Sequence, residues 1–337
     1  MNQANFADIH RNFPGGLSAY SRQTIQRIKS NDPRVIQVHI DNILSQDEDD
    51  AESFANALRG NNHLKYVCFG NDDYDSDHID FVLSALTETK VIEIGIWPLA
   101  ASSNTSRRVV CSNYYAMRIG ETIKLMPMIN KLGFRGCSLG PATAISLAEN
   151  LAGNKTLEHI DLSGNAIGDD GAIAFAIALR TNNTLKELVL DENQLSVSGQ
   201  RALRNSIYDD SSFDALEDSN HTIQSFFSSS PRSVFGKAVM NDCFHSLAAN
   251  LRSRSKKEAV TKKIHRYLQK KHSVKLQHQS FLCMQIAVMP HLLGFISTRC
   301  DVETMRDIIR HMPHLLEMGG KQNGADELNE QLGLLKI

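Results

Sequence analysis

A run of aspartates near position 75 is the part of the sequence closest to a metal site. Asp73, Asp75 and Asp77 have the spacing of the first three ligands in a helix–loop–helix calcium site. However, His78 stands where such a loop needs glycine, and Ser84 stands where it needs a bidentate glutamate. We therefore interpret the run as a solvated loop between a strand and a helix, and we predict no metal.

Two other patterns could carry chemistry. His265 with His272, and His311 with His314, could each place two metal ligands on a helix, but no cysteine or carboxylate completes a zinc set. The residues Gly-Asn-Lys-Thr from Gly153 end like a phosphate loop but lack the glycine five positions earlier. Neither a Gly-x-Ser-x-Gly elbow nor a cysteine–histidine catalytic signature is found. The sequence therefore predicts no enzyme and no cofactor.

Composition places the chain among ordinary globular proteins. Its 337 residues are 42% hydrophobic and 22% charged, with a net charge of -2, which allows one or two domains. No basic stretch followed by an apolar one stands near the start, and the longest apolar stretch is too short for a bilayer. Six cysteines lie far apart, without a CxxC pair. We therefore expect reduced thiols, no transmembrane segment and a cytoplasmic location.

A repeat of about 28 residues organises the middle of the chain. The pattern Leu-x-x-Ile-x-Leu-x-x-Asn-x-Ile begins at Leu157, and an equivalent pattern begins 28 residues later at Leu185. Each is followed by apolar residues at helical spacing, so each unit predicts a short strand and a helix. Weaker copies begin at Val35, Leu64, Val91 and Ile129. The last step is ten residues too long, which predicts a loop within residues 100–115.

Asparagines stand at the turn of the two clearest repeats, at Asn165 and Asn193. A side-chain amide both donates and accepts, so it can satisfy backbone groups left unpaired where the chain leaves a strand. We predict this structural role for both residues. Cys137 replaces the asparagine in the Ile129 repeat, and we expect the turns before it to be less regular.

Residues 35 to about 212, which carry these repeats, resemble the ribonuclease-inhibitor class of leucine-rich repeats. They are also similar to the repeat regions of NOD-like receptors. The resemblance implies an α/β fold, in which a right-handed solenoid or horseshoe has a parallel sheet on its concave side and helices outside. It also implies a non-catalytic scaffold or regulator that binds a protein partner.

The chain is expected to have four parts. Residues 1–34 would form an N-terminal cap, and residues 35–212 the repeats, because a stack of repeats needs closed ends. Residues 213–234 would form a degenerate last repeat and a linker, since Phe213-x-x-Leu216 falls on the register and a serine-rich stretch follows. Residues 235–337 would form an α-helical C-terminal region.

Residues between the inward-pointing positions of each strand should face the concave side. This rule places on one surface Tyr66, Glu93, Trp97, Lys131, Arg135, His159, Asp161, Glu187 and Asp191. The basic members, Lys131 and Arg135, should then neighbour the acidic ones across the strands. We interpret the surface as a partner-binding site in which Trp97, the single tryptophan, is an anchor. The alternative is charge pairing on a solvated sheet.

Charge is unevenly distributed along the chain. Residues 41–80 hold eleven acidic and two basic residues, whereas residues 237–275 hold eleven basic and two acidic ones. The basic segment 252–275 has three interpretations, which are a solvated helix face, docking onto an acidic protein surface, and binding of nucleic acid or acidic lipid. Tyr267 is its one aromatic residue besides histidine, which argues against stacking on single strands.

Overall fold

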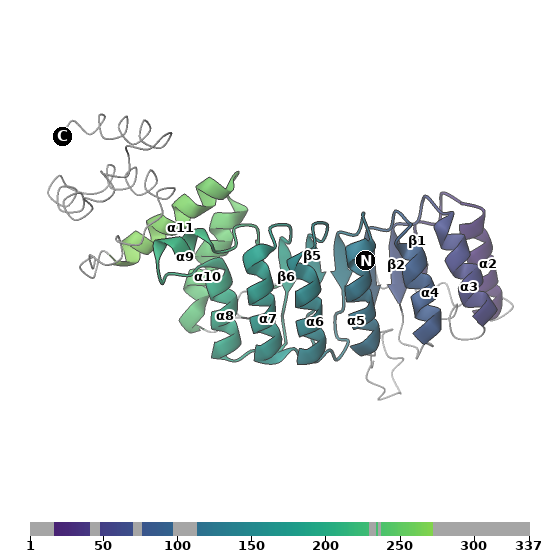
Figure 1. Ribbon diagram of the computed structural model, residues 1–337, viewed down its shortest axis with the longest axis horizontal. Coiled ribbons are helices and arrows are strands. Elements are labelled where there is room, and N and C mark those ends of the chain that lie inside the picture. The colour runs from purple at the N-terminus through teal and green to yellow at the C-terminus, as the bar shows by residue number, and fades with distance from the viewer. Residues whose placement is uncertain are drawn as a thin grey trace. The chain divides into compact units, whose positions relative to one another are not determined.

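Six short parallel strands form one sheet in chain order, β1 to β6 (Figure 1). The computed structural model describes residues 17–40, 48–69, 76–96, 113–228, 234 and 237–271. The strands are β1 Gln37–His39, β2 Tyr66–Phe69, β3 Glu93–Ile96, β4 Lys131–Gly133, β5 His159–Asp161 and β6 Glu187–Val189. Parallel neighbours require a crossover between them, and helices provide these crossovers.

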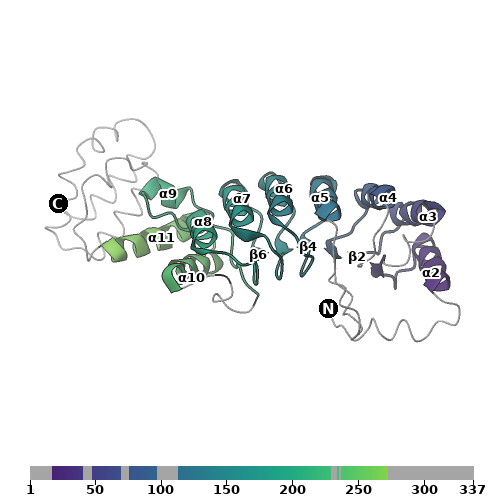
Figure 2. The same ribbon diagram turned by 90° about the horizontal axis from the view of Figure 1, so that it is seen from below.

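Helices cover one face of this sheet, as Figure 2 shows for α3 to α7. Successive helices from α3 to α7 also pack against one another in chain order. The helices are α2 Leu17–Lys29, α3 Glu48–Arg59, α4 Ser76–Leu86, α5 Asn113–Thr122, α6 Pro141–Ala152, α7 Gly168–Thr181, α8 Val197–Ile207, α9 Phe213–Glu217, α10 Lys237–Leu251 and α11 Lys256–Lys271, with a 3-10 turn η1 at Ile123–Leu125.

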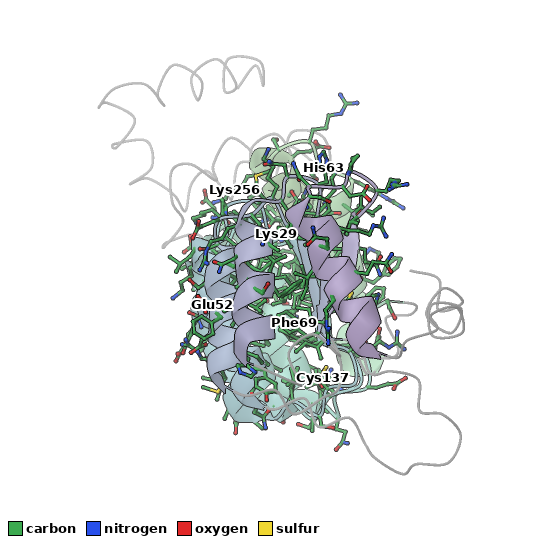
Figure 3. All side chains as sticks on the ribbon, turned by 90° about the vertical axis from the view of Figure 1, so that its right-hand side faces the viewer. Lys29, Glu52, His63, Phe69, Cys137 and Lys256 are labelled. Atoms are coloured by element: carbon green, nitrogen blue, oxygen red, sulfur yellow. The ribbon has the colours of Figure 1, made fainter. Side chains whose placement is uncertain are left out.

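The second apolar position of each predicted repeat forms a buried row through the sheet. Its members pair in register from strand to strand, and they are Val38, Val67, Ile94, Leu132, Ile160 and Leu188. Figure 3 shows Phe69 of β2 inside the molecule, whereas Glu52 of α3 lies on its outside. The predicted α/β architecture with a parallel sheet is therefore confirmed, and so are the six repeat strands.

Helices α6 and α7 approach closely at Gly171. A Cβ atom at this position would lie 2.3 Å from Cγ2 of Ile167 and 2.7 Å from Cβ of Ala144. Gly171→Ala should lower the free energy of unfolding by about 1 kcal/mol, because overpacking costs about 1–3 kcal/mol and the helix preference of alanine offsets about 1. Gly153→Ala is the control, since its Cβ would meet nothing within 4 Å. Urea unfolding checks both variants, and equal stabilities would contradict the expectation.

The last strand-like segment lies later in the chain than predicted. Residues Phe213–Glu217 form helix α9, whereas the 28-residue register of the predicted degenerate repeat would begin a strand at Phe213-x-x-Leu216. Instead, Ser225 forms a parallel bridge with Glu187 of β6. The backbone N–H groups of Leu188 and Leu190 donate to the carbonyls of Ser225 and Phe226, each at 3.0 Å. The predicted linker therefore begins with residues that belong to the sheet.

The chain divides into two compact units. The first unit contains Met1–Gln200 and Ser225–Gly236, and it holds the six-stranded sheet. The second unit contains Arg201–Gln224 and Lys237–Ile337, and it holds α9, α10 and α11. Trp97, the aspartates at 72, 73 and 75, and the predicted C-terminal region after Lys271 lie outside the described residues.

Candidate partner-binding surface

The first residues of five strands form a polar row across the sheet. Tyr66 pairs with Glu93, Glu93 with Lys131, Lys131 with His159, and His159 with Glu187. Lys131 is exposed and the other four are partly exposed, whereas the next residue in each strand is buried. Because side chains alternate along a strand, the row faces away from the helices. The structure thus brings together five of the nine residues predicted for this surface.

Two ion pairs connect neighbouring repeats at or next to the row. Nδ1 of His159 lies 2.9 Å from Oε2 of Glu187, and Nζ of Lys186 lies 2.8 Å from Oε2 of Glu158. In the part of the chain that the structure describes, no ion pair joins Lys131 to an acidic residue. The register places Lys131 between Glu93 of β3 and His159 of β5, so Lys131 has an acidic neighbour across the strands but forms no ion pair with it.

Arg135 and Asp161 lie at the strand ends next to the row. Arg135 follows β4, is exposed and has no ion pair among the described residues, so the alternative of charge pairing on a solvated sheet is not seen at this residue. Asp161 ends β5, and its Oδ1 accepts the N–H of Ser163 at 2.9 Å and the O–H at 2.6 Å. That carboxylate is turned toward its own backbone. The accessible cations of the surface are therefore Lys131 and Arg135.

Asp191 does not belong to an accessible surface. It is only 6% exposed, and its Oδ2 accepts both the N–H and the O–H of Ser228, each at 2.6 Å. The expectation that Asp191 contacts a partner is wrong, because the segment that pairs with β6 covers it. Trp97, the predicted anchor, lies outside the described residues.

The two turn asparagines make the hydrogen bonds that their structural role requires. Nδ2 of Asn165 donates to the carbonyls of Phe134 and Leu162, at 2.8 and 2.7 Å, and its Oδ1 accepts the N–H of Leu139 at 3.0 Å. Asn193 repeats this one unit later, with Nδ2 2.9 Å from the carbonyl oxygen of Leu162. Each asparagine therefore ties its own turn to the turn of the preceding repeat.

Cys137 continues this series with a weaker donor. Its Sγ lies 3.7 Å from the carbonyl oxygen of Ile96 and 3.6 Å from that of Arg135. A thiol can donate one weak hydrogen bond, whereas an amide donates two and also accepts. A cysteine at this position therefore keeps the contact between repeats, but the hydrogen bonding after β4 is weaker than at the asparagine turns.

A second series of buried asparagines supports the opposite ends of the strands, and the sequence interpretation missed it. Oδ1 of Asn154 accepts the N–H groups of Thr156 and Leu157, and Asn182 repeats this 28 residues later. Nδ2 of Asn182 also donates to the carbonyl of Asn154 at 2.9 Å. The available signal was Asn-x-His/Thr-Leu/Ile, which begins at Asn61, Asn154, Asn182 and Asn220.

Within the described residues, no three metal-binding side chains converge. None of the helices described there has the length and apolar character that crossing a bilayer requires. Among the described residues, the candidate site is therefore the polar row on β2 to β6, together with the two cations Lys131 and Arg135.

Comparison with known proteins agrees with the repeat geometry. The family described as Leucine Rich repeat matches residues 153–176. A search of curated proteins finds no match. Among solved structures, leiomodin-1 actin-binding site 2 is 16% identical, with 75% of this chain and 96% of that chain covered and a TM-score of 0.30. The tropomodulin C-terminal domain of Caenorhabditis elegans is 10% identical, with 75% and 98% covered and a TM-score of 0.27. Neither structure carries an argument about binding.

The family match falls on one of the two clearest repeats, since residues 153–176 include β5 and the first nine residues of α7. The same strand register extends from β1 to β6. Residues 153–176 therefore match a leucine-rich repeat, and they lie in a fold with a parallel sheet on one side and helices on the other.

Proposed function

We propose that the chain is a non-catalytic scaffold or regulator of the ribonuclease-inhibitor-like kind. It binds a cytoplasmic protein partner on the concave, helix-free face of a horseshoe-shaped solenoid and on its rim. The observation that carries this proposal is the polar row Tyr66, Glu93, Lys131, His159 and Glu187, which the strand register aligns on the face opposite the helices. Arg135 and Asp161 lie at the strand ends beside this row, and the proposed site also includes Trp97, which is outside the described residues.

Two features support binding over simple solvation. Lys131 and Arg135 are exposed cations that have no ion pair within the described part of the chain. Both asparagine series tie the strand ends of neighbouring repeats together by hydrogen bonds, which favours a preorganised row. A preorganised surface loses less conformational entropy on binding, which favours affinity.

Reversing the two cations should abolish partner capture. The variant Lys131→Glu with Arg135→Glu is compared with the unchanged chain as bait in extract of the native cell, followed by quantitative mass spectrometry. We expect the signal of at least one captured protein to fall about tenfold or more, because like charges across an interface are strongly unfavourable. The melting temperature should stay nearly unchanged, since both side chains are exposed.

The matched control is Lys124→Glu with Lys155→Glu, which makes the same charge change at two exposed lysines outside the row. This control should capture the same proteins as the unchanged chain. If the row variant captures them as well, the binding site lies elsewhere and the proposed surface is refuted.

A second candidate is binding of nucleic acid or acidic lipid through residues 252–275. Exposed Arg252, Arg254 and Lys256 favour it, whereas the burial of Lys263 removes one cation from that surface. A salt titration of binding to duplex DNA and to anionic vesicles tests it. Several phosphate contacts would give a steep loss of affinity with salt, and a flat dependence would exclude this mode.

A further inference from the structure

Helix α11 carries a lysine inside the second unit. Lys263 is 1% exposed and lies on the face of α11 that also buries Ala259, Val260, Ile264 and Tyr267. Among the described residues, no carboxylate lies within ion-pair distance of it. Burying an ammonium group without an acidic partner is costly unless its N–H groups find acceptors. The acceptors therefore decide what this lysine does.

One turn supplies all three acceptors. Nζ of Lys263 lies 2.7 Å from the carbonyl oxygen of Asn220, 2.9 Å from Nδ1 of His221 and 3.4 Å from Oγ of Ser219. This turn, residues 219–223, follows α9, and α11 packs against α9 in the same unit. A single side chain thus joins α11 to the turn at three atoms.

Burial and the donor that faces its Nδ1 hold His221 neutral in this arrangement. Its Nε2–H donates to the carbonyl of Glu217 at 2.9 Å, and Oε2 of Glu217 is also buried. Its Nδ1 faces an ammonium group, which can only donate, so Nδ1 must accept. Burial, followed by the positive charges of Lys263 and Lys256, lowers the pKa of His221 to about 3, whereas the bond to Glu217 opposes that shift.

We propose that Lys263 and His221 form a proton-sensitive latch, which holds α11 against the turn at neutral pH and opens on acidification. In the closed latch only one of the two side chains is a cation, and this cation is Lys263. A second proton on Nδ1 of His221 would set two donors and two positive charges 2.9 Å apart in a buried site. Once the latch is open, both groups are solvated and both can be charged.

The direction of the pH effect follows from proton binding. In the open state of the latch, His221 has its ordinary pKa of 6.5, whereas in the closed state this pKa is lowered to about 3. Between these values the open state binds one more proton, so each pH unit below 6.5 weakens closure up to tenfold. At pH 5.0 this amounts to about 30-fold. Burial and the charge of Lys256 also lower the pKa of Lys263, which adds an effect of the same direction at higher pH.

Hydrogen-exchange mass spectrometry on the full chain tests the latch. Peptides from α11 are followed at pH 7.5 and pH 5.0, with rates converted to protection factors so that the intrinsic pH dependence cancels. We expect protection of α11 to fall by about 10- to 30-fold at pH 5.0. Peptides from α6 and α7 of the first unit serve as the internal reference and should keep their protection. Unchanged protection of α11 would overturn the proposal.

The matched variant is His221→Gln, which keeps a carbonyl acceptor for Lys263 and an amide donor for Glu217 but does not titrate. Its α11 protection should differ by less than about twofold between the two pH values. If this variant loses protection as strongly as the unchanged chain, another group is responsible and the latch is refuted. An NMR titration of the His221 ring in the unchanged chain decides the matter independently. Protonation near pH 6.5 without loss of α11 protection would also refute it.

Discussion

Replacing Asn165 by alanine is expected to lower the free energy of unfolding by about 2 to 4 kcal/mol. The variant removes the acceptor of the Leu139 N–H and the donor to the carbonyl of Phe134. Both backbone groups would remain buried at the turn, and each unsatisfied group costs about 1–3 kcal/mol. The carbonyl of Leu162 is affected less, because Asn193 also donates to it.

Urea unfolding followed by circular dichroism measures this effect. Asn183→Ala is the matched control, because Asn183 is exposed and has one long hydrogen bond of 3.4 Å to the carbonyl of Thr181. We expect the control to change the free energy of unfolding by less than about 0.5 kcal/mol. Similar stabilities for the two variants would mean that the turn asparagines are not the supports that we describe.

The fold could be predicted because its core depends on local spacing. A strand with an inward-pointing residue at every second position has little freedom of register, so Val38 to Leu188 align as the repeat period indicates. The polar row follows from the same alternation, which places Tyr66 and Lys131 on the opposite face. These features need no knowledge of distant contacts.

The seventh strand-like segment could not be placed by counting residues. Helix α9 occupies the position at which a strict 28-residue period puts a strand. The distance from Asn182 to Asn220 is 38 residues, so the repeat contains ten extra residues. A search for the asparagine pattern instead of a fixed period would have found Ile223 and Phe226, since Asn220-His-Thr-Ile223 repeats Asn182-Asn-Thr-Leu185.

The solvent exposure of the candidate site residues was the property least predictable from the sequence. Asp191 has the same place in its repeat as exposed Arg135, yet Ser228 covers it. The pairing of acidic with basic side chains also depends on the length of each side chain and on which strand lies next to it. For this reason Glu187 contacts His159, and Lys131 contacts no acid in the described part of the chain. Burial by a segment distant in sequence leaves no local signal.

Phe226→Ala should be among the most destabilising single substitutions in the chain. If the serine-rich stretch of residues 213–234 were a linker, Phe226 would be exposed and its substitution nearly neutral. The structure instead buries it completely, at 0% exposed, and its carbonyl accepts the N–H of Leu190, which directly follows β6. Truncating a buried phenylalanine costs about 3–5 kcal/mol, since it removes apolar contacts and leaves a cavity.

The matched control for this prediction is Phe244→Ala. Phe244 lies on α10 and is 52% exposed, so the same truncation there should cost less than about 1 kcal/mol. The free energies of unfolding of both variants are compared with that of the unchanged chain by urea titration. If the two phenylalanine variants are equally stable, Phe226 belongs to a linker and the sheet ends at β6. If Phe226→Ala alone is destabilised, residues 225–228 are part of the repeat core, and any shortened chain must retain them to stay folded.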